Sequence, residues 1–167
     1  NCSALTALYK LGNKKVALSG VKNYWLSGHS QPEACDELFG HLLKESPNWN
    51  QLLTQRIELA LKEQNIGLAL YLLGKLPEGE KNKTLLRNIH RTPSNIAKLD
   101  EANPLHNDFY LYGLKRMISK DLNQAILFWK HVHANSFLSD EQKQDFLIKL
   151  SLYLSLIHIS EPTRHNA

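Results

Sequence analysis

The feature that most constrains the fold is the steady alternation of short amphipathic segments with turn residues along the chain. Apolar residues recur three and four positions apart, as they do on one face of a helix. The breaks between segments, such as Gly12-Asn13 and Pro77-Glu78-Gly79, contain residues that end helices. No run of four or more residues alternates apolar and polar side chains with the period of two typical of strands. The sequence therefore predicts an all-α fold.

The predicted helices are similar in length and are joined by short connections. They begin at Ala4, at Lys14 and at Pro32, and continue as segments 50–64, 66–76, 81–89, 93–99, 106–119, 123–135 and 140–153. In the second helix, which ends near Leu26, we expect four buried residues: Val16, Ala17, Val21 and Trp25. Helical hairpins of this size cannot bury their apolar stripes alone. We therefore expect antiparallel hairpins stacked into an α-superhelix, or solenoid.

A weak internal repeat supports the solenoid. The stretches Asn65–Tyr71 and Asp121–Leu127 both resemble the turn and second-helix start of a tetratricopeptide repeat, in which a small Ala lies at a close helix contact. Neither stretch keeps the full repeat pattern. The sequence therefore indicates degenerate tetratricopeptide-like repeats.

Composition excludes some classes of partner. With 167 residues, 43% of them hydrophobic and 22% charged, the chain is long enough for one domain with a core. No run approaches the roughly 18 apolar residues of a membrane-spanning helix. The net charge of +4 suits an anionic partner. However, the lysines are scattered without interleaved aromatic residues, so we expect a solvated surface and no nucleic-acid partner.

One stretch, WLSGHSQPEACDELF from Trp25 to Phe39, is specific enough to indicate a family. It contains an apolar-plus-Trp helix end, a Gly turn, Ser-Gln-Pro and a helix opening Ala-Cys-Asp-x-Leu-Phe. The matching positions are Trp25, Leu26, Gly28, Ser30, Gln31, Pro32, Ala34, Cys35, Asp36, Leu38 and Phe39. Together with the upstream Cys2, this pattern resembles the α-superhelical domain of the soluble lytic murein transglycosylases. The resemblance weakens after Leu76 and covers a minor part of that family's length.

The resemblance implies a function in the periplasm. Members of the family cleave the peptidoglycan glycan strand between N-acetylmuramic acid and N-acetylglucosamine, and they form a 1,6-anhydro product. Their superhelix makes a platform that holds the glycan strand or its peptides near a lysozyme-like catalytic domain. Peptidoglycan, through the parent enzyme, and proteins of cell-wall synthesis are the partners that the resemblance implies.

The two cysteines admit three chemical states. As residue types alone, Cys2 and Cys35 could be buried free thiols, a disulfide, or part of a zinc site with His29 and His41. A zinc site needs further ligands at suitable spacing, and near Cys35 the sequence offers none except His29 and His41, so no metal is expected. The family resemblance implies a Cys2–Cys35 disulfide, because the family shares both positions. Closing a loop of this length stabilises a fold by about 3–4 kcal/mol.

Catalytic residues cannot be assigned from the resemblance. The family's catalytic glutamate stands in an apolar stretch ending Glu-Ser-x-Phe, with Gly-Leu-Met-Gln and Ala-Tyr-Asn-x-Gly segments further on. Here the only Glu-Ser pair, Glu45-Ser46, is followed by Pro47-Asn48, and the single methionine, Met117, has no Gly-Leu before it. We therefore expect no catalytic residue, no cofactor and no turnover in this portion of the enzyme.

Other titratable residues do not form a pattern typical of a catalytic or metal site. His131 and His133 are two positions apart, so on a helix they point in nearly opposite directions and cannot share a metal. The acidic group Glu33, Asp36 and Glu37 opens a predicted helix, where negative charge is favourable against the helix dipole. Both sets are interpreted as structural.

The C-terminal segment has a separate explanation. Leu154–Arg164 reads LSLIHISEPTR, which resembles the translation of a transposase adapter used in sequencing libraries. We therefore expect residues 1–153 to be a partial superhelical domain and residues 154–167 to be a non-native tail. The start of the tail can extend the last helix by propensity, and Pro162 should stop it. The chain also opens without a signal peptide, which we interpret as truncation.

Two functions fit these observations. The first is a non-catalytic helical scaffold within a soluble lytic murein transglycosylase. The second is a generic tetratricopeptide-like module that binds a protein partner. A lysozyme-like domain downstream in the intact gene would favour the first.

Overall fold

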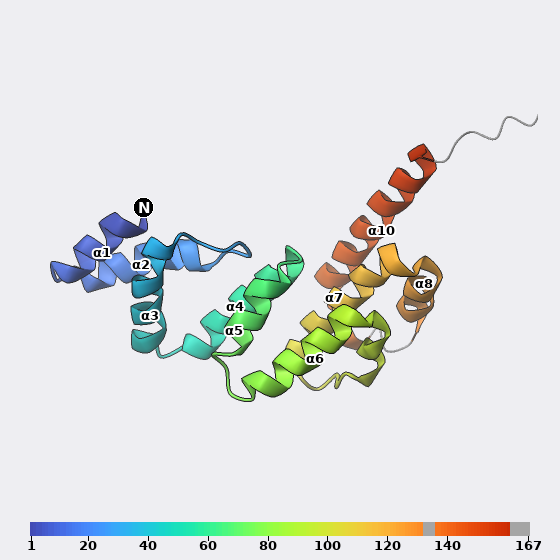
Figure 1. Ribbon diagram of the computed structural model, residues 1–167, viewed down its shortest axis with the longest axis horizontal. Coiled ribbons are helices and arrows are strands. Elements are labelled where there is room, and N and C mark those ends of the chain that lie inside the picture. The colour runs from blue at the N-terminus through green and yellow to red at the C-terminus, as the bar shows by residue number, and fades with distance from the viewer. Residues whose placement is uncertain (132–135, 161–167) are drawn as a thin grey trace, which may run out of the picture. The chain divides into compact units, whose positions relative to one another are not determined.

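The computed structural model describes residues 1–131 and 136–160, and every regular element in these ranges is helical. The absence of strands from the described residues confirms the all-α prediction. The chain divides into two compact units, which we call unit 1 (Asn1–Thr84) and unit 2 (Leu85–Ala167). Figure 1 shows the helices of both units in chain order.

Unit 1 is built from helical hairpins. Its elements are α1 (Cys2–Lys10), α2 (Lys14–Trp25), the 3₁₀ helix η1 (Glu33–Cys35), α3 (Asp36–Glu45), α4 (Trp49–Lys62), α5 (Ile66–Leu73) and the start of α6 (Gly79–Arg91). Helix α1 packs along α2, and α4 packs along α5 (Figure 1). Between α1 and α2 the chain reverses at Gly12, whose φ of +98° favours glycine. The predicted break at Gly12-Asn13 is confirmed.

The buried stripe of α2 differs from the prediction at one position. Ala17, Val21 and Trp25 are at most 2% exposed, but Val16 is 61% exposed, so its predicted burial is wrong. The three buried residues are four apart and form a single row on the helix. Val16 lies about 100° around the helix from Ala17, outside that row. The stripe that α2 presents to its neighbours is therefore narrower than the sequence suggested.

Three predicted segments begin, end or wind differently from the prediction. The helix expected to begin at Pro32 opens as the 3₁₀ helix η1, and α3 begins at Asp36. Helix α5 stops at Leu73, because the amides of Lys75 and Leu76 bond to carbonyls three residues earlier and form turns. The segment predicted at 93–99 is the 3₁₀ helix η2 (Pro93–Lys98), which also has three-residue hydrogen bonds at its ends. All of these differences concern short segments, in which a few three-residue hydrogen bonds replace those of an α-helix.

Unit 2 is organised around α7. Besides the rest of α6 and η2, it contains α7 (Pro104–Lys120), α8 (Leu122–Lys130) and α10 (Asp140–Ser160). Helix α7 packs against η2, α8 and α10. Its neighbours approach closely at Gly113, where an added Cβ would collide with the side chains of Ile89 and Ile96. The helix predicted at 123–135 reaches Lys130, and residues 132–135 lie outside the described residues.

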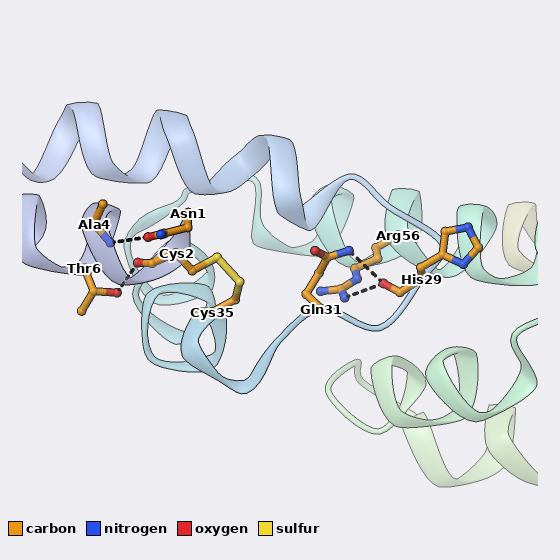
Figure 2. The surroundings of a disulfide bond; sticks show 8 residues. All are labelled: Asn1, Cys2, Ala4, Thr6, His29, Gln31, Cys35 and Arg56. Atoms are coloured by element: carbon orange, nitrogen blue, oxygen red, sulfur yellow. Dashed lines mark hydrogen bonds between the residues drawn. A yellow bond between two sulfur atoms is a disulfide. The ribbon is translucent and has the colours of Figure 1, made fainter.

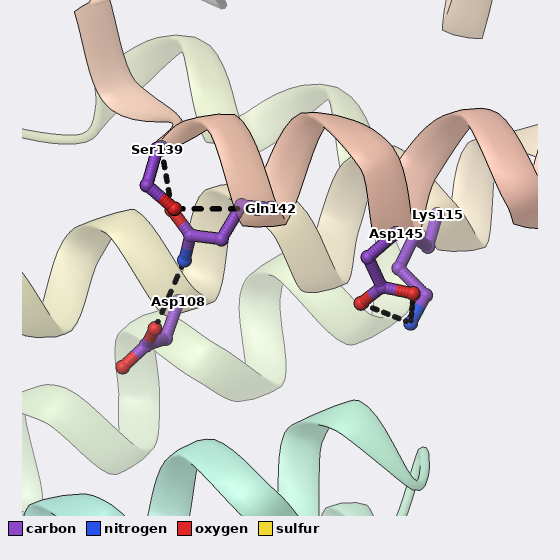
Figure 3. Close-up of polar contacts among 5 residues, drawn as sticks. All are labelled: Asp108, Lys115, Ser139, Gln142 and Asp145. Carbon is purple, nitrogen blue, oxygen red and sulfur yellow. Dashed lines mark hydrogen bonds and ion pairs between the residues drawn. The ribbon is translucent and has the colours of Figure 1, made fainter.

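Polar contacts fix α10 against α7, as Figure 3 shows. At the start of α10, the Ser139 amide donates to Oε1 of Gln142 (3.0 Å) and the Gln142 amide donates to Oγ of Ser139 (3.2 Å). This reciprocal arrangement is a capping box. Nε2 of Gln142 also donates to Oδ1 of Asp108 on α7. Two turns further along, Lys115 of α7 forms an ion pair with Asp145 of α10 at 3.1 Å, and Lys115 is 5% exposed.

Helix α10 runs past Tyr153 and ends at Ser160. Leu154, Leu156 and Ile159 are all exposed. Pro162, the predicted stop, lies outside the described residues. Among the residues that the structure describes, no helix is long and apolar enough to cross a membrane.

Candidate functional site

A disulfide fixes the start of unit 1. Cys2, the first residue of α1, is bonded to Cys35 at the end of η1, with 5.0 Å between their Cα atoms (Figure 2). Both residues are buried. The side chain of Asn1 caps α1 by accepting a hydrogen bond from the Ala4 amide at 2.9 Å. The disulfide that the family resemblance implies is thus present, and it ties α1 to the element that opens α3.

The loop between α2 and η1 packs tightly against the end of α4. A Cβ at Gly28 would collide with the backbone carbonyl of Leu59 and with the side chain of Glu63. The Gly28 carbonyl accepts a hydrogen bond from Nδ2 of Asn65 at 3.2 Å. Oδ1 of the same Asn65 caps α5 by accepting from the Leu68 amide. The glycine of the WLSGHS sequence therefore serves close packing, and the loop is fixed at its middle.

A buried guanidinium lies beside this loop. The Arg56 side chain of α4 packs on two aromatic rings, with its central carbon 4.6 Å from the Trp25 ring and 4.9 Å from the Phe39 ring. The indole of Trp25 is itself held by donation from Nε1 to the Leu52 carbonyl at 2.8 Å. The two rings meet edge to face, which is a favourable geometry. Three helices thus contribute to one cation–π stack.

The polar atoms of Arg56 are poorly satisfied. Arg56 is 4% exposed, and Nη2 donates to the His29 carbonyl at 3.4 Å, a contact that Figure 2 shows beside Gln31. Nε has no hydrogen-bond partner in the described part of the chain. Burial lowers the pKa of Arg56, and the nearby Tyr71 and Asp36 partly offset that effect. Because the ordinary pKa of arginine is far above neutral, the group stays charged. Unit 1 therefore contains a buried positive charge without a carboxylate in ion-pair contact among the described residues.

A groove of about 420 Å³ opens beside this stack. Its walls come from α2, α3, α4, α5 and the loop before η1, and the lining residues are Trp25, Ser30, Gln31, Asp36, Phe39, Gly40, Leu43, Arg56, Gly67, Leu68, Tyr71 and Lys75. Tyr71 is 63% exposed, and Nζ of Lys75 lies 4.9 Å from the centre of its ring. The groove thus combines an accessible aromatic ring, two cations and several hydrogen-bonding side chains.

The histidines considered as metal ligands from the sequence mainly make structural contacts. His29 is 3.7 Å from Glu63 in an exposed pair, and His41 stacks on Tyr9 with ring centres 4.3 Å apart. Among the described residues, no group of His, Cys, Asp or Glu could hold a metal ion. His133 lies outside the described residues.

The acidic group is divided between two elements. Asp36 and Glu37 stand in the first turn of α3, as the helix-dipole interpretation requires, and Glu33 begins η1. Glu37 also pairs with Lys10 at 3.7 Å.

Sequence reasoning missed the groove itself. Trp25 and Phe39 were recognised as parts of a motif, but Arg56, Tyr71 and Lys75 gave no signal of their own. These residues come from α4, α5 and the turn that follows α5, so only tertiary packing brings them together.

Unit 2 contains a smaller, mainly apolar hollow of about 290 Å³. The ring of Tyr110 lines it and stacks on Phe137 with ring centres 4.7 Å apart. The Tyr110 hydroxyl is buried and has no hydrogen-bond partner among the described residues, and burial raises its pKa to about 12. Among the residues that the structure describes, the lining of this hollow contains no Lys, Arg, Asp or Glu.

Comparison with known proteins gives a consistent result. No protein-family model matches the chain. The soluble lytic murein transglycosylase of Salmonella typhimurium is 32% identical over 147 residues, which are 86% of this chain and 23% of that protein. The Escherichia coli K12 protein of the same name is 37% identical over 76 residues, or 46% of this chain and 12% of that protein. The chain is a homologue of the soluble lytic murein transglycosylases.

The homology covers a limited part of these enzymes. The chain spans about a quarter of the length of the Salmonella relative. The crystal structure of the 70 kDa soluble lytic transglycosylase SLT70 from Escherichia coli matches 92% of this chain and 25% of that one, with a TM-score of 0.73 and 24% identity. This likeness confirms the predicted fold class, an α-superhelix of helical hairpins.

Proposed function

We propose that this chain is a non-catalytic helical scaffold of a periplasmic soluble lytic murein transglycosylase. Its parent enzyme would cleave peptidoglycan glycan strands to 1,6-anhydromuropeptides, with the chemistry performed outside these 167 residues. The observation that carries the proposal is homology over 86% of the chain in a sequence that contains none of the family's catalytic segments. The scaffold would hold glycan near the catalytic domain.

The disulfide supports the proposed compartment. Disulfides form and persist in oxidising environments such as the bacterial periplasm and are rare in the cytosol. The Cys2–Cys35 bond is buried and joins two elements of unit 1. Proteins of cell-wall synthesis are further proposed partners, since helical hairpin arrays present extended surfaces for protein binding.

The test uses purified peptidoglycan sacculi. We expect the chain to cosediment with sacculi and to release no anhydromuropeptides during prolonged incubation, as measured by chromatography of the soluble fraction. A buffer blank and an unrelated helical protein of similar net charge control for background release and for charge-driven binding. Turnover above the blank would contradict the non-catalytic assignment. Failure to cosediment more than the control protein would contradict the scaffold function.

A further inference from the structure

The buried positive charge of Arg56 is incompletely compensated by its neighbours. A buried charge is normally paired with an opposite charge and fully hydrogen-bonded, because leaving it unpaired is costly. Arg56 has two aromatic rings, one long hydrogen bond of 3.4 Å and an Nε without a partner. The free protein therefore holds a positive charge that an incoming anion would stabilise.

The groove above Arg56 offers a second recognition element. The Tyr71 ring is 63% exposed although it is large and mainly apolar. Nζ of Lys75 lies over this ring, so a cation stands next to an accessible aromatic face. Aromatic rings pack well against the C–H faces of pyranose sugars, which are apolar, while the hydroxyl groups at the sugar's edge need polar partners. Ser30 and Gln31 on one wall and Asp36 on another supply them.

We infer that this groove is a subsite for a saccharide carrying a carboxylate, of the type in which a lactyl group is attached to an N-acetylated pyranose. The sugar face would pack on Tyr71, and the carboxylate would lie in the field of Arg56 and Lys75. A volume of about 420 Å³ is within the range of small-ligand sites and suits one or two sugar rings. Asp36 leaves the lining with one net positive charge, which favours a single carboxylate.

This inference rests on the proposed function, because it names the part of the glycan that the scaffold would hold. It goes further in assigning binding to one groove of unit 1. It also requires sugar and carboxylate together, so a neutral chitin-type disaccharide should bind poorly. An isolated stem peptide, which brings carboxylates without a sugar, should bind poorly as well.

The experiment titrates the full chain with three probes, following backbone amide chemical shifts by NMR. The probes are an N-acetylglucosaminyl–N-acetylmuramic acid disaccharide with a free lactyl carboxylate, N,N′-diacetylchitobiose, and a murein stem peptide. We expect the muramyl disaccharide to bind with shifts around the groove. We expect chitobiose and the peptide each to bind roughly tenfold more weakly, the change that corresponds to losing a charge-assisted contact. Raising the salt concentration should weaken the binding of the muramyl disaccharide more than that of chitobiose.

Exposed variants separate binding from folding. Tyr71→Ala and Lys75→Gln change exposed side chains, so the fold should survive. Each variant should bind the muramyl disaccharide with about tenfold lower affinity. Lys62→Gln is the matched control, because Lys62 is an exposed lysine at the end of α4 that does not line the groove. It should bind the disaccharide as the unaltered chain does.

The possible outcomes are distinct from those of the sacculus test. Equal affinity for the muramyl disaccharide and chitobiose, tighter binding of the stem peptide, or shifts outside the groove would overturn the inference. Unaltered binding in both Tyr71→Ala and Lys75→Gln would also overturn it. If sacculi bind and the disaccharide does not, the groove is not the subsite while the scaffold function stands.

Discussion

Among the residues that the structure describes, each unit buries one cation, and the two cations are stabilised in different ways. Arg56 in unit 1 is 4% exposed and Lys115 in unit 2 is 5% exposed. Lys115 has the carboxylate of Asp145 at 3.1 Å, whereas Arg56 has the rings of Trp25 and Phe39. A compact ammonium is strongly hydrated and needs a counter-charge when buried, but a planar guanidinium is weakly hydrated and can stack on aromatic faces. The Lys115–Asp145 pair in unit 2 therefore carries no net charge, while the charge of Arg56 in unit 1 stays available to a ligand.

The units also differ in how their chain ends are secured. Unit 1 contains a covalent link between α1 and η1. In unit 2, noncovalent contacts fix α10 to α7: the capping residue Gln142 reaches Asp108, and Asp145 reaches Lys115. The disulfide of unit 1 depends on redox conditions, whereas the contacts between α7 and α10 depend on the charges of their side chains. This contrast predicts that single changes will affect one unit and spare the other.

Removing the disulfide should have the largest effect. In a Cys2→Ser/Cys35→Ser variant, unit 1 should lose about 3–4 kcal/mol of stability, because the unfolded chain is no longer constrained by the crosslink. Hydrogen exchange should speed up in α1 and η1 and stay unchanged in α7. Reductant should reproduce the loss in the unaltered chain and have no effect on the variant. Equal loss of protection in both units would contradict the prediction that the effect stays in unit 1.

Breaking the buried ion pair should come next. Asp145→Ala leaves Lys115 buried without a counter-charge and should destabilise unit 2 by about 2–3 kcal/mol. This value is below the usual loss for a fully buried pair, because the Asp145 side chain is 23% exposed. Lys115→Met, which removes the charge and keeps the length, should be close to neutral in denaturant unfolding. A larger loss in Lys115→Met than in Asp145→Ala would show that the pair is stabilising in its own right.

Tyr110→Phe should stabilise unit 2 by about 1 kcal/mol, because it removes a buried hydroxyl that has no partner. Tyr112→Phe is the matched control. It removes a hydroxyl that is bonded to Nδ1 of His90 at 2.6 Å and should destabilise the unit by a similar amount. Thermal unfolding of both variants checks the signs.

The same tyrosine should make unit 2 sensitive to alkali. Burial raises the Tyr110 pKa from its ordinary 10.0 to about 12, so the folded state keeps a proton that the unfolded state releases first. This contribution to stability is fully present below pH 10 and is lost as the pH rises towards 12. The loss between these values should be smaller in Tyr110→Phe than in the unaltered chain.

Arg56→Met should change the stability of unit 1 by less than about 1 kcal/mol. The loss of the cation–π contacts is offset by removal of a buried, incompletely compensated charge. Urea unfolding measures the effect. A loss well above this value would show that the guanidinium is needed to hold Trp25 and Phe39 in place. The contrast with Asp145→Ala is the sharpest test of the difference between the two buried cations.

The smallest effect is expected at the end of unit 2. We propose that residues 1–153 form the superhelical portion and that residues 154–167 are a non-native tail. Deleting residues 154–167 should change stability by less than about 0.5 kcal/mol, because Leu154, Leu156 and Ile159 are exposed. A larger loss in thermal unfolding would show that the segment belongs to the fold.

Local sequence determined the helices and several of their ends. Apolar spacing predicted most of the helical segments, and Gly12-Asn13 predicted the turn after α1, because helix periodicity and capping depend on neighbours in the chain. The motif from Trp25 to Phe39 indicated the family, and with it the pairing of Cys2 with Cys35. Where local signals compete, as in the 3₁₀ helix η2, the same reasoning was less accurate.

Tertiary structure alone decided the candidate site. Arg56 reads as an ordinary surface residue of an amphipathic helix until α2 and α3 bring the rings of Trp25 and Phe39 against it. The groove needs Tyr71 from a hairpin partner of α4, and no periodicity encodes that neighbour. In the same way, sequence could not tell that Val16 lies outside the buried row while Lys115 lies inside the core. Periodicity fixes which residues share a face of a helix, but burial and charge compensation depend on which other helices pack against that face.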